Sequence, residues 1–208
     1  MIKKYWFLGI PIIFVIYRYM ENKEFLKKFI DHIQRWEGKL GGSPKDTGAI
    51  KNGGYAPGTK YHTSKGVTWG TYKNFCTKYG YPIKVSRWLE MPIDLWTKIL
   101  NKVFIEKWNL DKLKLVNPKL AYFIIEVAWM SSNMGAEKFF ANYLRSKGIY
   151  DNDIKPNEMQ KYFLQLIANG DLDMNELYQA RFNQYKTFHN YDEYGNGWEN
   201  RLNAYIKL

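Results

Sequence analysis

The chain has 208 residues, which is enough for one domain with a hydrophobic core, or for one domain with a small additional lobe. Its 46% hydrophobic and 25% charged residues exclude a disordered chain, and its formal charge of +11 indicates a polyanionic partner: nucleic acid, anionic lipid or the bacterial wall. Because Lys and Arg are spread along the sequence without a basic arm, the charge does not favour nucleic acid, and no nucleic-acid partner is expected.

The N-terminus carries a short apolar segment. Two lysines precede an apolar run from Tyr5 to Tyr17, and an arginine follows it. The run has the length of a signal-peptide core but falls short of the roughly 20 residues that span a bilayer, and no small-residue cleavage site follows. We therefore expect residues 1–20 to form an uncleaved signal anchor that tethers the chain to the inner membrane through residues 5–17. A cleaved signal peptide and an N-terminal element packed on the domain are the alternatives.

The next predicted helix ends near Gly38 and brings one carboxylate to the end of an apolar stripe. Residues 25–36 repeat apolar side chains at intervals of three and four, the period of an amphipathic helix. Glu37 continues the stripe of Ile30 and Ile33. Partial loss of solvation there favours the protonated carboxyl that a general acid needs. The alternative is a solvated helix-end glutamate that pairs with a neighbouring basic residue.

Residues 38–67 are rich in glycine and contain two prolines, which predicts a long loop or short β-hairpin region rather than a helix. An irregular stretch of this length inside a compact domain is usually functional. Helices are predicted from the N-cap Thr68 to Gly80, from Pro92, and from Pro118 toward Gly135. The fold class is therefore mainly α, with any β structure confined to about 38–67. Further helical patterns cover 136–147, 157–169, 173–188 and 198–207.

The sequence indicates chemistry without a metal. Cys76 is the only cysteine, so no disulfide forms within the chain, and it lies in an apolar helical pattern with Phe75 and Tyr79. We interpret Cys76 as a core residue rather than a nucleophile, because a cysteine nucleophile needs a nearby base and the chain has only three histidines. The cysteine and the histidines have no zinc-ligand spacing, so no metal and no cofactor are expected.

An ordered set of residues follows Glu37. The sequence runs E-G-K-L-G-G-S-P-K-D-T-G, then an aromatic, glycine-rich stretch, then H-T-S-K-G-V-T. A helix-end glutamate, a glycine turn, a second carboxylate nine residues on and a threonine in a loop resemble the layout of phage-type lysozymes. More closely, the sequence resembles glycoside hydrolase family 108, phage and bacterial N-acetylmuramidases whose motif runs Glu-Gly-Gly, Pro, Asp, Gly-Gly, then Thr and Gly-Ile/Val-Thr. The matching residues are Glu37, Gly38, Pro44, Asp46 and Gly48 and, after an insertion, Thr63, Gly66, Val67 and Thr68.

Two further signatures of that family lie downstream. The segment Ser132-Asn133-Met134-Gly135 matches an Asn-x-Gly at which a helix ends and a peptidoglycan-binding region begins. The segment Gly197-Trp198-Glu199-Asn200-Arg201 matches a Gly-Trp-x-x-Arg on the last helix, where we interpret Trp198 and Arg201 as structural. The sequence departs from the pattern at Lys39, which replaces the second glycine of the motif, and at about 50–61, which is inserted.

The resemblance implies a mainly α, lysozyme-like fold with a catalytic region at 21–115 and a helical peptidoglycan-binding region at 116–208. It implies cleavage of the MurNAc–GlcNAc β-1,4 bond of peptidoglycan glycan strands, with Glu37 as the general acid. Asp46 would stabilise the developing positive charge or orient a water, and Thr63 would hold that water. Turn and capping roles are the alternatives for Asp46 and Thr63.

Substrate-binding side chains are expected in the same stretch and beyond it. Tyr55, Tyr61 and Trp69 are candidates for stacking on sugar rings, and Asn133 is a candidate for bonding substrate amides. A core position for Trp69 and a helix-capping role for Asn133 are the alternatives.

The resemblance also sets the expected setting and its rivals. We expect a monomer in the periplasm or at the periplasmic face of the inner membrane, acting as an endolysin in phage-type lysis or in local wall remodelling. Storage in the cytoplasm until a phage-type release is the alternative location. The rival functions are a lytic transglycosylase and a non-catalytic, secretion-associated protein that binds peptidoglycan. A basic nucleic-acid binder would explain none of the ordered motif.

Overall fold

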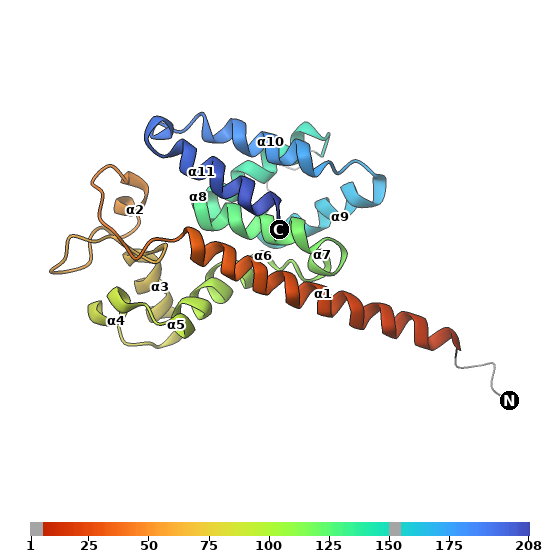
Figure 1. The fold of residues 1–208 in the computed structure, drawn as a ribbon, viewed down its shortest axis with the longest axis horizontal. Helices are drawn as coiled ribbons and strands as arrows, with labels where there is room; N and C mark the ends of the chain where they lie inside the picture. The colour runs from red at the N-terminus through yellow and green to blue at the C-terminus, as the bar shows by residue number, and fades with distance from the viewer. Residues whose placement is uncertain (1–5, 150–154) are drawn as a thin grey trace. The chain divides into compact units, whose positions relative to one another are not determined.

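The computed structural model describes residues 6–149 and 155–208, and the chain divides into two compact units (Figure 1). Unit 1 contains the N-terminal segment up to His32 and Trp108–Leu208, and unit 2 contains Ile33–Lys107. The boundaries of these packing units differ from those of the predicted functional segments, 21–115 and 116–208. The functional segments stay a prediction.

The helix predicted over 25–36 is the C-terminal part of a longer helix, α1 (Trp6–Trp36). Its last residue lies two positions before Gly38, as the sequence predicted. Of the predicted anchor, residues 1–5 and the side chains of 6–19 lie outside the described part of the chain. Within the described residues, no helix is both long and apolar enough to cross a membrane. The anchor stays a prediction.

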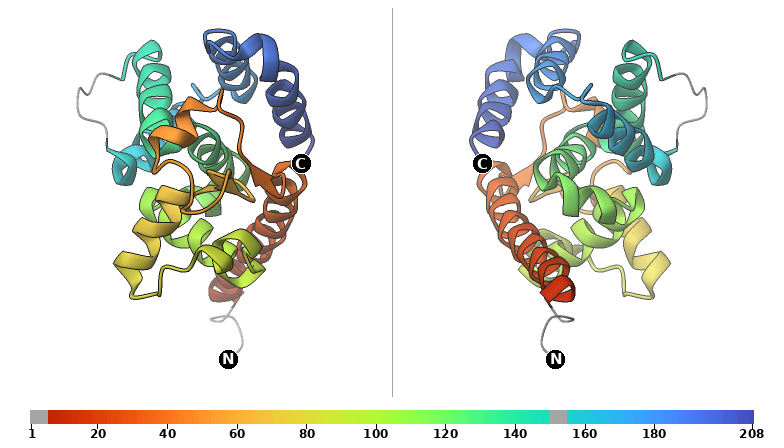
Figure 2. Two further views of the ribbon diagram at one scale, coloured as in Figure 1. Left: turned by 90° about the vertical axis from the view of Figure 1, so that its left-hand side faces the viewer. Right: turned by 90° about the vertical axis from the view of Figure 1, so that its right-hand side faces the viewer.

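Unit 1 is built around one long helix, α8 (Pro118–Ser146). Every residue from Leu120 to Trp129 is buried, which is the pattern of a helix surrounded by other elements. Among its neighbours are α10 (Met174–Tyr185) and α11 (Tyr191–Ile206), which pack against each other (Figure 2). The remaining elements of unit 1 are α7 (Asp111–Val116), a 3-10 turn η2 (Pro156–Glu158) and α9 (Met159–Asn169).

The start of α8 was predicted, but its interior was not. Asn117 caps the helix, since its side chain accepts a hydrogen bond from the Leu120 amide at 2.9 Å, and Pro118 occupies the first turn. The sequence predicted a helix end near Gly135 and a new helix from 136. Instead α8 continues through a kink at Ser132, whose φ of 67° and ψ of 162° are not helical.

A buried ion pair joins the helices of unit 1. Glu126 of α8 is 3% exposed and accepts a hydrogen bond from Arg201 Nη2 of α11 at 3.1 Å, while His32 Nε2 of α1 lies 3.6 Å from its carboxylate. Burial alone would raise the pKa of Glu126, but the charges of Arg201 and His32 outweigh burial and lower it. The structural role predicted for Arg201 is therefore confirmed.

Unit 2 begins with the last turn of α1 and contains a small antiparallel sheet of order β1-β2-β3. Its strands are β1 (Leu40–Gly41), β2 (Thr63–Ser64) and β3 (Val67–Thr68). Lys65 and Gly66 form the tight turn between β2 and β3, and both have positive φ values, of 45° and 78°. Two-residue turns of this kind match the twist of the strands that they connect. The β structure thus lies in the stretch where it was predicted, and it ends at Thr68.

A short helix that the sequence did not predict interrupts this stretch, α2 (Thr47–Lys51). The helices that follow are α3 (Trp69–Tyr79), α4 (Val85–Glu90) and α5 (Ile93–Ile99), and α5 continues through a π-helical turn η1 (Leu100–Ile105) into α6 (Glu106–Trp108). Thr68 caps α3 and Gly80 ends it with a φ of 71°, as predicted.

Two buried tryptophans of these helices form hydrogen bonds with the β2–β3 hairpin. Trp88 Nε1 donates to the Val67 carbonyl oxygen at 3.2 Å, and Trp96 Nε1 donates to the Lys65 carbonyl oxygen at 2.9 Å. Cys76 is 1% exposed in this core, where burial raises the pKa of its thiol. Its predicted core position is confirmed.

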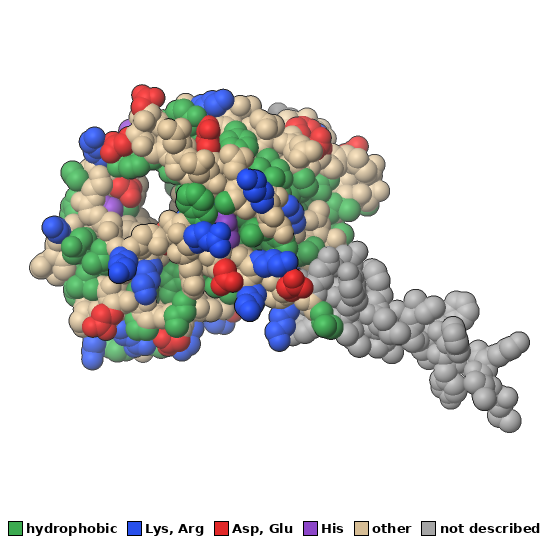
Figure 3. Space-filling view, viewed as in Figure 1, with side chains coloured by type: hydrophobic (Ala, Val, Ile, Leu, Met, Phe, Trp, Pro, Cys, Tyr) green, Lys and Arg blue, Asp and Glu red, His purple; other side chains and the backbone are tan. Residues whose placement is uncertain are grey.

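The charge follows the pattern seen in the sequence. Figure 3 shows Lys and Arg side chains dispersed over the visible face, with Asp and Glu among them, rather than gathered in one patch. The prediction of a mainly α fold with a small β region is confirmed.

Candidate active site

Glu37 lies where the first helix ends and the sheet begins. It follows Trp36, the last residue of α1, and its amide still donates to the Ile33 carbonyl oxygen at 3.0 Å. Its side chain is half-buried, and β1 starts three residues later at Leu40. Ile33, one turn before Glu37, is completely buried, so the apolar stripe leads up to the carboxylate as predicted.

The sheet pairs the predicted threonine with the strand that follows Glu37. Thr63 of β2 is the direct partner of Gly41 in β1, and the Lys65 amide donates to the Lys39 carbonyl oxygen at 2.8 Å. The pairing of the two segments therefore begins two residues after Glu37. Thr63 itself is half-buried.

His62 is a candidate residue that the sequence did not single out. Its imidazole is 1% exposed, with Nδ1 at 2.9 Å from Thr63 Oγ1 and Nε2 at 3.0 Å from the Ser43 carbonyl oxygen. A carbonyl oxygen can only accept, so Nε2 carries a proton in this arrangement. In the tautomer that carries this proton on Nε2 alone, Nδ1 accepts a hydrogen bond from the Thr63 hydroxyl. The lone pairs of Thr63 Oγ1 can then accept a hydrogen bond from another group.

The same ring connects Thr63 with the turn that carries Asp46. The Ser43 carbonyl oxygen, which His62 contacts, also accepts a hydrogen bond from the Asp46 amide at 3.1 Å. Asp46 Oδ1 accepts from the Ala49 amide at 3.0 Å and thereby caps α2. The capping alternative for Asp46 is thus present in the structure. The carboxylate is half-buried, and its catalytic role stays a prediction.

The inserted segment at about 50–61 is folded against the start of α3. The Asn52 side-chain amide donates to Thr68 Oγ1 at 2.8 Å and to Thr71 Oγ1 at 3.1 Å. Gly53, with a φ of 103°, packs so closely on Gly70 that a Cβ atom at Gly53 would lie 2.4 Å from the Gly70 Cα. The inserted segment therefore packs in a defined position against the start of α3.

The candidate stacking rings differ in exposure. Tyr55 is 39% exposed, and its ring lies 5.5 Å from the His62 ring; Tyr61 is half-buried. Trp69 is 4% exposed and packs edge-on against Trp88 at 5.5 Å. These contacts favour the core position for Trp69, whereas Tyr55 and Tyr61 stay candidates for sugar stacking.

Asn133 belongs to unit 1 and is part of the kink in α8. Its Oδ1 accepts a hydrogen bond from Trp108 Nε1 at 2.8 Å. The contact gives Asn133 a structural role that the sequence did not predict, and its contact with substrate amides stays a prediction. Within residues 6–149 and 155–208, no cluster of three or more His, Cys, Asp or Glu side chains is arranged to hold a metal ion.

Comparison with known proteins supports the fold. No model of a known protein family and no curated protein sequence matches the chain. A solved structure of SagA from Brucella abortus matches with a TM-score of 0.62 and 19% sequence identity, over 89% of this chain and 94% of that one. At this identity the similarity shows a shared fold alone, and glycoside hydrolase family 108 stays a resemblance.

Proposed function

We propose that this chain is an N-acetylmuramidase that hydrolyses the MurNAc–GlcNAc β-1,4 bond of peptidoglycan, with Glu37 as the general acid. The observation that carries the proposal is the position of a half-buried Glu37 at the junction of α1 and a β-sheet that presents Thr63. The lysozyme-like fold is compatible with a role at the cell wall. A formal charge of +11 favours the approach to an anionic polymer.

The reaction needs a proton on the glycosidic oxygen while positive charge develops on the sugar ring. Glu37 supplies that proton, because its half-buried carboxyl group follows directly on the last residue of α1 and precedes the strand that pairs with β2. The bond between the sugar carbon and the glycosidic oxygen then breaks, and the oxygen leaves with the proton of Glu37.

Water completes the reaction: its oxygen bonds to the sugar carbon, and the proton that it releases goes to Asp46, or to the Glu37 carboxylate once the leaving group has departed. Thr63 Oγ1 accepts a hydrogen bond from the attacking water, since the Thr63 hydroxyl donates its own hydrogen bond to His62 Nδ1 and keeps its lone pairs available. One oxygen of Asp46 is engaged in capping α2, and we assign the other to the water or to the developing charge. The anomer of the new reducing end separates these two roles, because inversion requires a water between the two carboxylates.

The setting follows from the sequence. Residues 5–17 would hold the enzyme at the periplasmic face of the inner membrane, in reach of the glycan strands. A water-positioning threonine favours hydrolysis over the lytic transglycosylase reaction, in which the sugar's own hydroxyl group replaces water.

The chemical structure of the released muropeptides tests the proposed function. The full chain is incubated with purified peptidoglycan, and the released muropeptides are analysed by mass spectrometry before and after borohydride reduction. The proposal predicts reducible MurNAc ends. Products lighter by one water, which borohydride does not reduce, would identify a lytic transglycosylase. Sedimentation with peptidoglycan without any release would identify a non-catalytic binding protein.

A further inference from the structure

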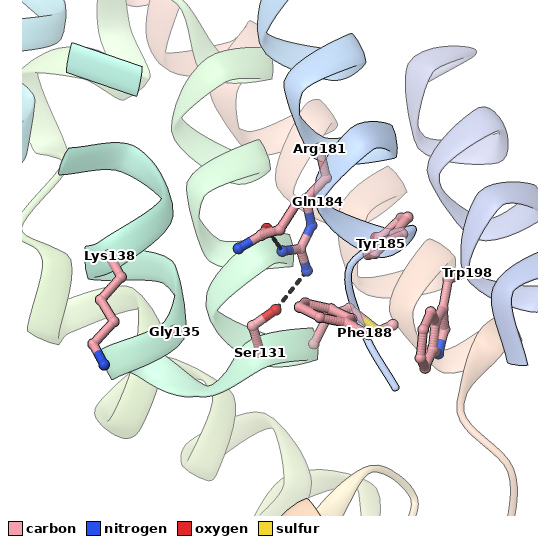
Figure 4. Close-up of a pocket in the computed structure, with 9 residues that line it drawn as sticks. Ser131, Gly135, Lys138, Arg181, Gln184, Tyr185, Phe188 and Trp198 are labelled. Atoms are coloured by element: carbon pink, nitrogen blue, oxygen red, sulfur yellow. Dashed lines mark hydrogen bonds between the residues drawn. The ribbon is translucent and has the colours of Figure 1, made fainter. Parts of the chain in front are cut away.

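Unit 1 contains a cavity of about 380 Å³ whose lining residues lie apart from the candidate catalytic residues Glu37, Asp46 and Thr63 in the sequence. Helix α8 lines it with Ser131 and Lys138, α10 lines it with Arg181 and Tyr185, and Phe188 and Trp198 complete its wall. Figure 4 shows the Arg181 guanidinium between Ser131 and Gln184, with the aromatic side chains beside it. The volume lies in the range of small-molecule sites.

The main feature of the cavity is a buried cation without a counter-ion. Arg181 is 1% exposed, and among the described residues it forms no ion pair with a carboxylate. Its hydrogen bonds go to neutral oxygens, Ser131 Oγ at 2.5 Å and Gln184 Oε1, and its Nε has no hydrogen-bond partner among the described residues. Arg201, which is buried to a similar extent, pairs with Glu126.

The aromatic neighbours of Arg181 contact it by cation–π interactions but bring no formal negative charge. The guanidinium lies 4.5 Å from the centre of the Tyr185 ring and 5.5 Å from that of Phe139. Burial raises the pKa of Tyr185, so the phenol stays neutral beside the cation. A buried charge that lacks an opposite charge is costly, and an anionic ligand would remove that cost.

The backbone of α8 is strained where it meets this cavity. Ser132 has a φ of 67° with a ψ of 162°, a combination that only glycine adopts readily. Two hydrogen bonds hold the kink: Trp108 Nε1 donates to Asn133 Oδ1 at 2.8 Å, and the Gly135 amide donates to Ser132 Oγ at 3.3 Å. The kink sets Ser131 against Arg181, and strained backbone of this kind is concentrated at ligand sites.

We propose that this cavity binds a carboxylate that carries a small apolar group and, resting on the proposed function, that this is the C-terminal D-alanine of a peptidoglycan stem peptide. The planar guanidinium of Arg181 matches the two oxygens of a carboxylate. The Ser131 hydroxyl accepts from Arg181 and has its own proton to donate. Lys138, exposed at the rim, adds a second positive charge.

The aromatic wall selects the group beside the carboxylate. Trp198 packs against Tyr185 at 5.7 Å and against Phe188 at 5.6 Å, and together the three rings form an apolar surface. A methyl group fits such a surface, whereas a second charge would lose solvation there without a partner. The enzyme would thereby favour strands whose stem peptides end in alanine.

The test is the binding of N-acetyl-D-alanyl-D-alanine to the full-length protein, compared with the same dipeptide as its C-terminal amide. We expect the acid to bind at least about tenfold more tightly than the amide, because only the acid brings a negative charge to the Arg181 guanidinium, and hydrogen bonds between charged groups are the stronger ones. Arg181→Met should weaken binding of the acid by about ten- to a hundredfold. Lys161→Met, which removes an exposed charge from α9 of the same unit, should leave it unchanged.

Equal affinity for acid and amide, no binding of either, or unchanged binding in a folded Arg181→Met variant would overturn the proposal. Tighter binding of inorganic phosphate than of the acid would overturn the choice of a carboxylate. The comparison of acid and amide on the unaltered chain needs no variant, so it stands even where Arg181→Met does not fold. Selective binding without release of reducing ends would contradict only the proposed function, whereas release without selective binding would contradict only this inference.

Discussion

The two units of the chain hold their polar side chains in different ways. In unit 1, Glu126 and Arg201 lie on long helices, are almost completely buried and neutralise each other. In unit 2, Glu37 and Asp46 lie at the ends of short or terminating elements and are half-buried. A charge that is buried and paired stabilises a fold, whereas a group at the end of an element can still reach a substrate. We therefore expect loss of Arg201 to affect mainly the stability of the fold, and loss of Glu37 to affect mainly the activity.

The largest expected effect is on the buried pair. Arg201→Met leaves the carboxylate of Glu126 buried without its main partner, which should lower the free energy of unfolding by about 3–5 kcal/mol. Urea denaturation followed by circular dichroism measures it. Arg35→Met removes an exposed charge and should change the stability by less than about 0.5 kcal/mol. A loss below about 1 kcal/mol in Arg201→Met would remove the basis of the comparison.

The acid sensitivity of the fold should depend on the same carboxylate. Because the pKa of Glu126 is lower in the folded chain, its contribution to stability is fully present above its unfolded pKa of about 4.3. That contribution is lost as the pH falls through the folded value of about 2. We expect the free energy of unfolding to fall below about pH 5 and to fall less steeply in Glu126→Gln. Parallel slopes in both proteins would assign the acid sensitivity to other carboxylates.

A smaller effect, on activity, is expected from the ring that holds Thr63. His62→Phe keeps an aromatic ring but removes both the donor to the Ser43 carbonyl oxygen and the acceptor for the Thr63 hydroxyl. Release of reducing ends should fall by about tenfold, since poor positioning of a reacting group is costly. In a Thr63→Val background the same substitution should have little further effect. If the losses of activity in the two single variants multiplied in the double variant, His62 would act independently of Thr63.

The smallest effect concerns the helix that follows the sheet. Thr68→Ala removes the side chain that caps α3 and that Asn52 contacts, which should lower the free energy of unfolding by about 1 kcal/mol. Thr77→Ala, at an exposed position in the same helix, is the matched control and should change it by less than half as much. Equal losses in the two variants would mean that the cap is not what holds the inserted segment.

The features that the sequence predicted correctly depend on neighbouring residues. Thr68 and Gly80 bound α3 because a cap and a left-handed glycine act within one helical turn. Pro118 marks the start of α8 for the same reason. The period of three and four brings Glu37 to the end of α1 without information from the rest of the chain.

The features that the sequence did not predict depend on distant partners. The break in α8 is at Ser132 rather than at Gly135, and a hydrogen bond from Trp108 to Asn133, 25 positions apart, helps to hold it there. The two hydrogen bonds of His62 join residues on either side of the inserted segment. The position of His62 next to Thr63 was the available signal, but the Ser43 carbonyl group lies 19 positions away.

The proposed function depends on one proton donor at the start of unit 2, and Glu37→Gln removes it. The substitution keeps the shape and removes the acid. Release of reducing ends from purified peptidoglycan should fall by at least about a hundredfold, with an unchanged melting temperature. Glu90→Gln, at an exposed carboxylate in the same unit, should retain full activity. Activity in Glu37→Gln equal to that of the control would contradict the account, because another group would then supply the proton.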